Sequence, residues 1–366
     1  MMKYRKGNCL VGQSGGPTSI INASAAGVIE AAIASPYIEK IYGAHYGIEG
    51  ILNDDIFDFS KEDEENLKLL KYSPSSALGA CRYKLKPYMK SIEEYERVFS
   101  QFKKYNIKYF VYIGRNDSMD TVDKLNSYAK SINFDINIIG VPKTIDNDLF
   151  GTDHCPGFGS AAKYVATSII ELSRDGAVYD NEIINIVEVM GRNAGWLAAS
   201  SILAKTDIQM SPDMIYLPEV IFDVEEFITK LIEKFNKKKK LTVVVSEGIK
   251  DKSGRYICEI DTLNKDIFGH AQMGGVGDVL GNLIKEKVCK RVKVVELNIL
   301  QRCAMHWASK TDIDEAYKCG LDAVEYALGG YTGKMVTLER VSEYPYFCKT
   351  GLIDIEKVAN REKKYR

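Results

Sequence analysis

Short apolar runs rich in β-branched residues recur along the chain, and each is followed by a glycine or a polar turn. Examples are Tyr109–Ile113, Ile136–Gly140, Ile183–Val189 and Leu241–Val245. Runs of this length and composition are typical of buried strands. Segments with a helical pattern separate them. This alternation predicts an α/β fold with doubly wound, mostly parallel sheets, which binds ligands in a crevice at the carboxyl ends of its strands.

Composition narrows the class of protein. A chain of 366 residues, 45% hydrophobic and 27% charged, is long enough for two globular domains. A net charge of −1 gives no electrostatic basis for binding nucleic acid or an anionic membrane. No apolar run approaches the ~20 residues of a membrane span, and the eight cysteines form no C-x-x-C pair. We therefore predict a cytoplasmic protein with reduced thiols that binds neither nucleic acid nor membranes.

The most polar turn, Lys143–Asp148, follows the strand at Ile136–Gly140. Two carboxylates held close together suit two tasks, since Asp146 can take a proton from a substrate hydroxyl while Asp148 helps to organise a metal or the base. Lys143 is a point charge suited to a phosphate. The alternative is a polar turn with capping side chains, because aspartate and asparagine are common in turns.

A glycine-rich turn, GQSGGPTSIIN at 12–22, follows the first apolar run. We predict a helix from about Thr18 or Ser19, so that strand, turn and helix N-terminus form a phosphate cradle. Gly15 and Gly16 lack the Cβ atoms that would keep backbone N–H groups away from phosphate oxygens. A plain strand-to-helix turn is the alternative.

Five motifs in one order along the chain resemble the phosphofructokinase family, and more closely its pyrophosphate-dependent branch. The resemblance covers roughly Leu10 to Asn360, and the motifs are GQSGGPTSIIN, GRNDSMDT at 114–121, PKTIDND, MGRNAGW at 190–196 and SEG at 246–248. It implies two doubly wound, Rossmann-like domains. The phosphoryl-donor domain would comprise 1–158 and 302–346, and the sugar-phosphate domain 159–301 and 347–366.

The resemblance also implies which residues bind the donor. Gly15 and Gly16 would cradle it, with Ser118 beside them, and Arg82 would contact the transferred phosphoryl group. The family's ATP-using branch has glycine at the position of Asp117, whereas the pyrophosphate branch has aspartate, which repels the nucleotide's α-phosphate. Lys143 is the second mark of the pyrophosphate branch, so both positions agree, and the two side chains together would form a pocket sized for two phosphates.

For the sugar phosphate, the resemblance implies contacts from the two aspartates of the polar turn and from later motifs. The full set is Thr144, Asp146, Asp148, Met190, Gly191, Arg192, Glu247, Lys293 and Arg302. Arg302 and Lys293 would clamp the sugar 6-phosphate, and Glu247 would accept hydrogen bonds from sugar hydroxyls, although a glutamate at a strand end is often a neutral surface residue. Nucleotide-dependent relatives have an arginine seven residues before Met190 that reaches the sugar phosphate of a neighbouring subunit; here that position is Ile183, so we expect this contact to be absent.

Two departures from the family's pattern concern the donor side. Asn116 stands where many relatives have aspartate, a magnesium ligand, so a Mg²⁺ ion held by Asn116 and Asp148 would be bound more weakly or through water. Arg115 replaces a glycine. If its backbone needs a positive φ, arginine costs about 1 kcal/mol or more, and if its side chain lies against the donor it could bind pyrophosphate or block it.

We therefore predict a Mg²⁺-dependent diphosphate–fructose-6-phosphate 1-phosphotransferase, with Asp146 as base and Thr144, Lys143, Asp117 and Arg82 supporting it. It would move a phosphoryl group reversibly from pyrophosphate to the 1-hydroxyl of fructose 6-phosphate, as a homodimer or homotetramer. The alternatives are an ATP-dependent phosphofructokinase or related sugar-phosphate kinase, and a non-catalytic regulatory homologue.

The glycines at 275–281 lack the G-x-G-x-x-G spacing of a dinucleotide site, and His270–Met273 resembles another family signature that has lost its arginine.

Overall fold

The computed structural model describes residues 5–178, 180–208, 210–260 and 275–365, so the His270–Met273 segment lies outside the described residues. The chain divides into two compact units, residues 1–160 with 302–362, and residues 161–301 with 363–366. Within the described residues, no helix is long and apolar enough to cross a membrane.

Seven of the described strands form the sheet of the first unit, in the order β11-β10-β5-β4-β1-β2-β3. Neighbouring strands from β10 to β2 are parallel, whereas β11 and β3 pair antiparallel at the two edges. The strand bounds are β1 Gly7–Gln13, β2 Ile38–Ala44, β3 Ile56–Asp58, β4 Ile107–Gly114, β5 Asn137–Pro142, β10 Lys334–Glu343 and β11 Tyr346–Asp354.

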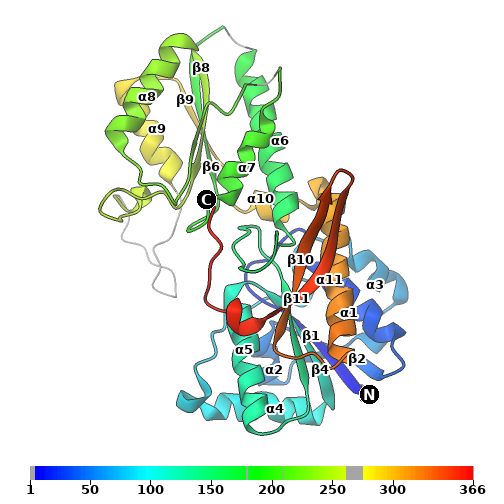
Figure 1. Cartoon of the computed structure of the whole chain (residues 1–366). Coiled ribbons are helices and arrows are strands. Elements are labelled where there is room, and N and C mark those ends of the chain that lie inside the picture. Colours follow the sequence, from blue (N-terminus) through cyan, green and yellow to red (C-terminus); the bar gives the residue numbers. More distant parts are fainter. Residues whose placement is uncertain (1–4, 179, 209, 261–274, 366) are drawn as a thin grey trace. The chain divides into compact units, whose positions relative to one another are not determined.

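Side chains along the central strands alternate between two cores. In β1, Leu10 packs in one core, while Cys9 and Val11 pack in the other. Both faces of the sheet are therefore covered, and the strands read as nearly continuous apolar runs. Figure 1 shows α1 and α11 along one face and α2, α4 and α5 along the other. The helix bounds are α1 Ile21–Ala34, α2 Ile48–Asn53, α3 Glu64–Leu70, α4 Ile92–Lys104, α5 Asn116–Ser131, α10 Leu300–Cys303 and α11 Lys310–Leu328, with 3-10 turns η1 Phe59–Lys61, η2 Tyr88–Lys90, η5 Met305–Trp307 and η6 Ile355–Lys357.

Helices α1 and α11 pack unusually closely because each carries a glycine at the crossing. A Cβ atom on Gly27 would lie 2.1 Å from the carbonyl oxygen of Tyr317, and one on Gly320 would lie 1.9 Å from that of Ser24. The small residues of the first helical segment thus allow backbone-to-backbone contact. The helix begins at Ile21, two or three residues later than the predicted start at Thr18 or Ser19.

The second unit contains a sheet of four described strands, all parallel, in the order β7-β8-β6-β9. Its strands are β6 Ile183–Val189, β7 Met214–Tyr216, β8 Lys240–Ser246 and β9 Val292–Glu296. Side chains of α8 and α9 pack on one face of β6 and β8. The helices are α6 Phe158–Ala177, α7 Trp196–Ser200, α8 Val224–Lys237 and α9 Val276–Lys287, with 3-10 turns η3 Ser201–Ala204 and η4 Ile257–Ile260. Two mostly parallel sheets flanked by helices confirm the predicted α/β class.

The division differs from the predicted one at the carboxyl end. Residues 347–362 lie in the first unit, where the prediction had assigned 347–366 to the second. The reason is the β10–β11 hairpin, because β11 pairs along β10 from Glu343 to Lys334. Ile355 and Val358 then bury their side chains in the core of the first unit. The binding roles of the two units stay predictions.

Candidate phosphoryl-transfer site

Three turns gather at the carboxyl edge of the first sheet, where β1, β4 and β5 lie side by side. The parallel register pairs Gln13 with Ile113 and Gly114 with Pro142, so the three strands end at one level. The amide N–H of Lys143 donates to the carbonyl of Gly114 at 3.0 Å, which ties the polar turn to the start of α5. Residues 14–16, 115–118 and 143–148 therefore share one edge, as expected for a parallel α/β sheet.

Lys143 is the buried cation of this edge. Its side chain is 2% exposed, and Nζ donates to the carbonyls of Ser14 at 2.8 Å and Gly16 at 2.6 Å. Burial, reinforced by the positive charges of Arg115 and Arg302, lowers the pKa of Lys143 to about 7. An ammonium whose proton is so weakly held is stabilised by any anion that binds beside it.

The glycine turn fits close to these cations. Gly15 has φ +76°, and a Cβ atom there would lie 3.3 Å from Lys143 Nζ. A Cβ atom on Gly16 would lie 2.9 Å from Arg302 Nη1. The positive φ favours glycine at Gly15, and both positions lie against the charged ends of long side chains. Arg302, predicted as a sugar 6-phosphate ligand, lies in the first unit beside Gly16.

Asp146 and Asp148 converge on Arg115. Arg115 Nη1 lies 2.9 Å from Asp146 Oδ2, while Nε and Nη2 donate to Asp148 Oδ2 at 2.9 and 2.7 Å. Burial raises the pKa of the Asp146 carboxyl, and the guanidinium opposes that shift. Thr144 Oγ1 accepts a hydrogen bond from the Asp146 amide at 3.0 Å, which orders the turn.

The backbone of Arg115 is not strained. The residue caps α5 with φ −99° and ψ −165°, an extended conformation that any residue adopts. The cost considered for a positive φ at this position therefore does not arise. The substitution acts through its side chain, which places a positive charge between two carboxylates.

The predicted metal ligands have unused oxygen atoms. Asp148 is 1% exposed, and its Oδ1 has no hydrogen-bond partner among the described residues; the same holds for Oδ1 and Nδ2 of Asn116. Buried polar atoms without partners are uncommon in native proteins, and a bound water or ion often satisfies them. Oxygen atoms of this kind suit Mg²⁺, which needs only one or two carboxylates when phosphates complete its shell. The described residues contain no group of three or more His, Cys, Asp or Glu side chains able to hold a metal ion alone.

Asp117 and Ser118 begin α5, but their side chains differ in environment. Asp117 is 76% exposed and lies 3.6 Å from Lys84 Nζ. The Asp117 carboxylate is therefore paired with Lys84 and not with Lys143. A joint pocket for pyrophosphate would have required Asp117 and Lys143 to face each other. Ser118 is buried, and a Cβ atom on Gly114 would lie 1.9 Å from its Oγ, so glycine is needed there.

Arg82 lies next to the glycine turn because the residue before it, Cys81, bonds to that turn. The Cys81 carbonyl accepts a hydrogen bond from the Gly15 amide at 2.9 Å, and Ser14 forms an isolated bridge with Cys81. The exposed Arg82 side chain follows directly. One charged residue near the site had no sequence signal: Glu362, which forms a bridge with Leu149 and acts electrostatically on both Asp146 and Arg115.

In the second unit, three of the predicted sugar ligands meet at the ends of β6 and β8. Gly191 has φ +129°, and a Cβ atom there would lie 2.6 Å from the Ala194 carbonyl, so glycine is required. The Gly191 amide donates to Glu247 Oε1 at 3.2 Å, and the Met190 amide donates to Gln301 at 3.2 Å. Gln301 had not been predicted.

Two other predicted sugar ligands lie apart from one another. Arg192 extends the Gly191 turn, and a Cβ atom on Gly248 would lie 1.9 Å from its carbonyl oxygen. Lys293, by contrast, is the second residue of β9, and its Nζ pairs with Asp175 of α6 at 3.1 Å. This ion pair at the beginning of the strand separates Lys293 from the cluster at the carboxyl ends of β6 and β8.

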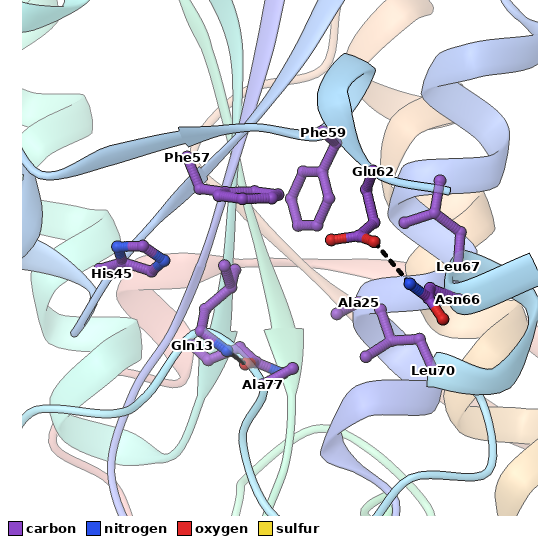
Figure 2. Close-up of a pocket in the computed structure, with 11 residues that line it drawn as sticks. Gln13, Ala25, His45, Phe57, Phe59, Glu62, Asn66, Leu67, Leu70 and Ala77 are labelled. Atoms are coloured by element: carbon purple, nitrogen blue, oxygen red, sulfur yellow. Dashed lines mark hydrogen bonds between the residues drawn. The ribbon is translucent and has the colours of Figure 1, made fainter. Parts of the chain in front are cut away.

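A cavity of about 360 Å³ opens in the first unit between α1, α3 and β3, and it contains none of the predicted site residues. Figure 2 shows the rings of Phe57 and Phe59 along one side, with Glu62 bonded to Asn66 at 2.7 Å nearby. Gln13, the last residue of β1, lines the cavity and accepts hydrogen bonds from Ser76 Oγ and the Leu78 amide. The cavity therefore lies next to the strand residue that directly precedes the glycine turn.

Comparisons with known proteins agree with this arrangement. Residues 8–327 match the family model described as phosphofructokinase. A pyrophosphate–fructose 6-phosphate 1-phosphotransferase of Halomonas elongata is 42% identical over 97% of this chain and 85% of its own length, and one of Xanthomonas campestris pv. campestris is 43% identical over 98% and 85%. The crystal structure of a pyrophosphate-dependent phosphofructokinase from Nitrosospira multiformis has a TM-score of 0.87 and 40% identity, covering 98% of this chain and 86% of that one.

These matches confirm the resemblance carried by the five ordered motifs and the fold type that it implied. The family match spans well over half of the chain, and both enzyme relatives match nearly all of it. The chain belongs to the phosphofructokinase family.

Proposed function

We propose that this protein transfers a phosphoryl group from pyrophosphate to the 1-hydroxyl of fructose 6-phosphate, giving fructose 1,6-bisphosphate and orthophosphate. The proposal is supported by relatives about 40% identical that carry this activity in their names. The structural observation that carries it is Lys143, a buried ammonium held against the Ser14–Gly16 turn. A point charge at this place suits the compact, highly charged pyrophosphate.

Asp146 is the proposed general base. It accepts the proton of the 1-hydroxyl as that oxygen forms a bond to phosphorus, while the bridging P–O bond of pyrophosphate breaks and orthophosphate leaves. Lys143 and Arg82 stabilise the charge that develops on the moving group, and Gly15 and Gly16 let backbone N–H groups approach the donor. Because pyrophosphate and the product ester are close in energy, the reaction runs in both directions.

Mg²⁺ is the proposed cofactor, held by Asn116 and Asp148 together with donor phosphates. When bound, it would neutralise charge on the donor oxygens. The unpartnered Oδ1 atoms of both side chains support this assignment. Their single negative charge provides weak binding on its own, so most of the affinity would come from the phosphates that accompany the ion.

The second unit is the proposed binder of the sugar phosphate. Met190, Gly191, Arg192 and Glu247 supply an apolar wall, a close backbone approach and polar partners for sugar hydroxyls. Arg302 stays the proposed 6-phosphate ligand, whereas Lys293 is not included because it pairs with Asp175. We further propose a cytoplasmic homodimer or homotetramer, which sedimentation or light scattering of the full chain would test.

The decisive assay measures fructose 1,6-bisphosphate formation with pyrophosphate and with ATP as donors. We expect turnover with pyrophosphate, and activity with ATP alone would contradict the donor assignment. Asp146→Asn should reduce turnover by about 10²–10⁴-fold while the protein stays folded, as expected for loss of a general base. Full activity of this variant would exclude Asp146 as the base.

A second candidate is a non-catalytic homologue that binds sugar phosphate. The observation in its favour is the ion pairing of Arg115 with both carboxylates of the polar turn. Calorimetric binding of fructose 6-phosphate without turnover by any donor would support it. Recovery of turnover in Arg115→Gly would then identify the guanidinium as the cause.

A further inference from the structure

The guanidinium of Arg115 occupies part of the position where a divalent cation would contact Asp148. Nε and Nη2 both donate to Asp148 Oδ2, at 2.9 and 2.7 Å, and Nη1 lies 2.9 Å from Asp146 Oδ2. Asp148 is almost fully buried, while the arginine side chain remains 42% exposed. A permanent positive charge thus covers one oxygen of the predicted metal ligand.

Two further oxygen atoms beside Arg115 suit a divalent cation. Asp148 Oδ1 and Asn116 Oδ1 are buried and have no hydrogen-bond partner in the described part of the chain. Carboxylate and carbonyl oxygens suit Mg²⁺ and Mn²⁺. A cation at these atoms would lie next to the oxygen that already binds Arg115, so the two positive charges repel each other.

Other charges around the pair do not remove this repulsion. Lys143 and Arg302 add positive charge on the glycine-turn side, whereas Asp146 and Glu362 add negative charge. The negative pair faces the guanidinium itself, since Asp146 and Glu362 both stabilise the charged form of Arg115. Arg115 is therefore firmly held in the ligand-free protein.

Resting on the proposed function, we infer that Arg115 is a positioning residue that excludes a free divalent cation from Asp148, so that the cation enters only together with pyrophosphate. The arginine fork has five N–H donors, and contacts to the two aspartates use three of them. The other two are available to phosphate oxygens, which bind guanidinium strongly. When the metal-bound anion arrives, hydrogen bonds from the guanidinium to phosphate oxygens would replace those it gives up to Asp148.

The test measures binding of Mn²⁺ alone, without pyrophosphate or sugar, from the free-ion electron paramagnetic resonance signal. The full chain is compared with Arg115→Gly, Arg115→Gln and Arg115→Lys. Removing the positive charge in the Gly and Gln variants should tighten Mn²⁺ binding by at least about tenfold. Arg115→Lys keeps the charge and should stay within about threefold of the unchanged protein.

A second substitution locates the effect. In Arg115→Gly combined with Asp148→Asn, the gain in Mn²⁺ affinity should disappear, because the carboxylate that the arginine covered is gone. Equal Mn²⁺ affinity in the unchanged protein, the Gly variant and the Gln variant would overturn the inference. A gain that survives Asp148→Asn would overturn it as well, since the cation would then bind elsewhere.

This readout does not depend on turnover, so it separates the two proposals. Exclusion of Mn²⁺ by Arg115 without pyrophosphate turnover would support the exclusion of the free cation and refute the proposed function. Pyrophosphate activity with unchanged Mn²⁺ affinity would do the opposite. Circular dichroism and thermal melts check that each variant is folded, and the Gln variant, which keeps much of the side-chain volume, covers the case in which glycine destabilises the start of α5.

Discussion

Lys143→Met should reduce activity and should change how the stability of the protein depends on pH. The lysine side chain is 2% exposed, and burial is the main cause that lowers its pKa from an ordinary 10.5 to about 7. Such a fall corresponds to roughly 4–5 kcal/mol of cost for keeping the charged form in the folded protein. Methionine has nearly the same length and no charge, so it removes this cost.

Part of the gain is lost again, because methionine donates no hydrogen bonds to the carbonyls of Ser14 and Gly16. Leaving the two acceptors unpaired costs about 1–3 kcal/mol for each carbonyl. The gain and the loss are of similar size, so we expect Lys143→Met to change the free energy of unfolding at pH 7 by at most about 3 kcal/mol. Turnover with pyrophosphate should fall, since the cation that receives the donor is gone.

The pH dependence provides the sharper check. Since the folded pKa lies below the unfolded one, the folded state binds fewer protons between pH 7 and about 10, and the cost falls as the pH rises through that window. The free energy of unfolding of the variant, relative to that of the unchanged protein, should fall by about 1.4 kcal/mol for each pH unit above pH 7. Urea unfolding at pH 7, 8 and 9 measures it, with the exposed Lys252→Met as control. A difference that stays constant with pH would refute the reasoning.

Two other changes test structural features of the first unit. Burial lowers the pKa of His154, but hydrogen bonds to Glu315 and Asp153 raise it by more, so the net shift is upward. The contribution of these bonds to the free energy of unfolding is therefore present below about pH 6.5. It is lost as the pH rises through the pKa of the folded state. His154→Gln should lower the free energy of unfolding more at pH 5.5 than at pH 8.5, and equal losses at both would contradict the ion-pair account. Gly320→Ala should destabilise by about 1–3 kcal/mol, because its Cβ atom would lie 1.9 Å from the Ser24 carbonyl; an unchanged urea midpoint would mean that α1 and α11 can separate freely.

The fold was predictable because local signals and sheet packing agree. Apolar runs marked the central strands, and the two cores on either side of β1 explain why those runs show no clear alternation of polar residues. The antiparallel β11 was not predicted. Its exposed residues carry no buried-strand pattern, and a hairpin closed by Tyr344-Pro345 depends on pairing with β10 rather than on its own composition.

The candidate site was predictable in its members more than in its contacts. Residue types and spacing indicated a base, a cation and a glycine turn, and the structure brings Asp146, Lys143 and Gly15 to one edge of the first sheet. Sequence could not show that Asp117 turns to Lys84, because the first turn of a helix lets a side chain face either the site or solvent. Nor could it find Glu362, which lies in a charged tail without a motif.

Arg115 shows most clearly why contacts need the sheet register. From sequence alone it could have strained the backbone, bound the donor or blocked it. The pairing of Gly114 with Pro142 places the residue after β4 opposite the turn after β5, so a long side chain there reaches Asp146 and Asp148. Because its φ is negative, no backbone cost opposes the substitution. Its consequence is electrostatic: a fixed cation stands where neighbouring oxygens favour a mobile one, so the affinity for Mn²⁺ alone directly measures what the arginine does.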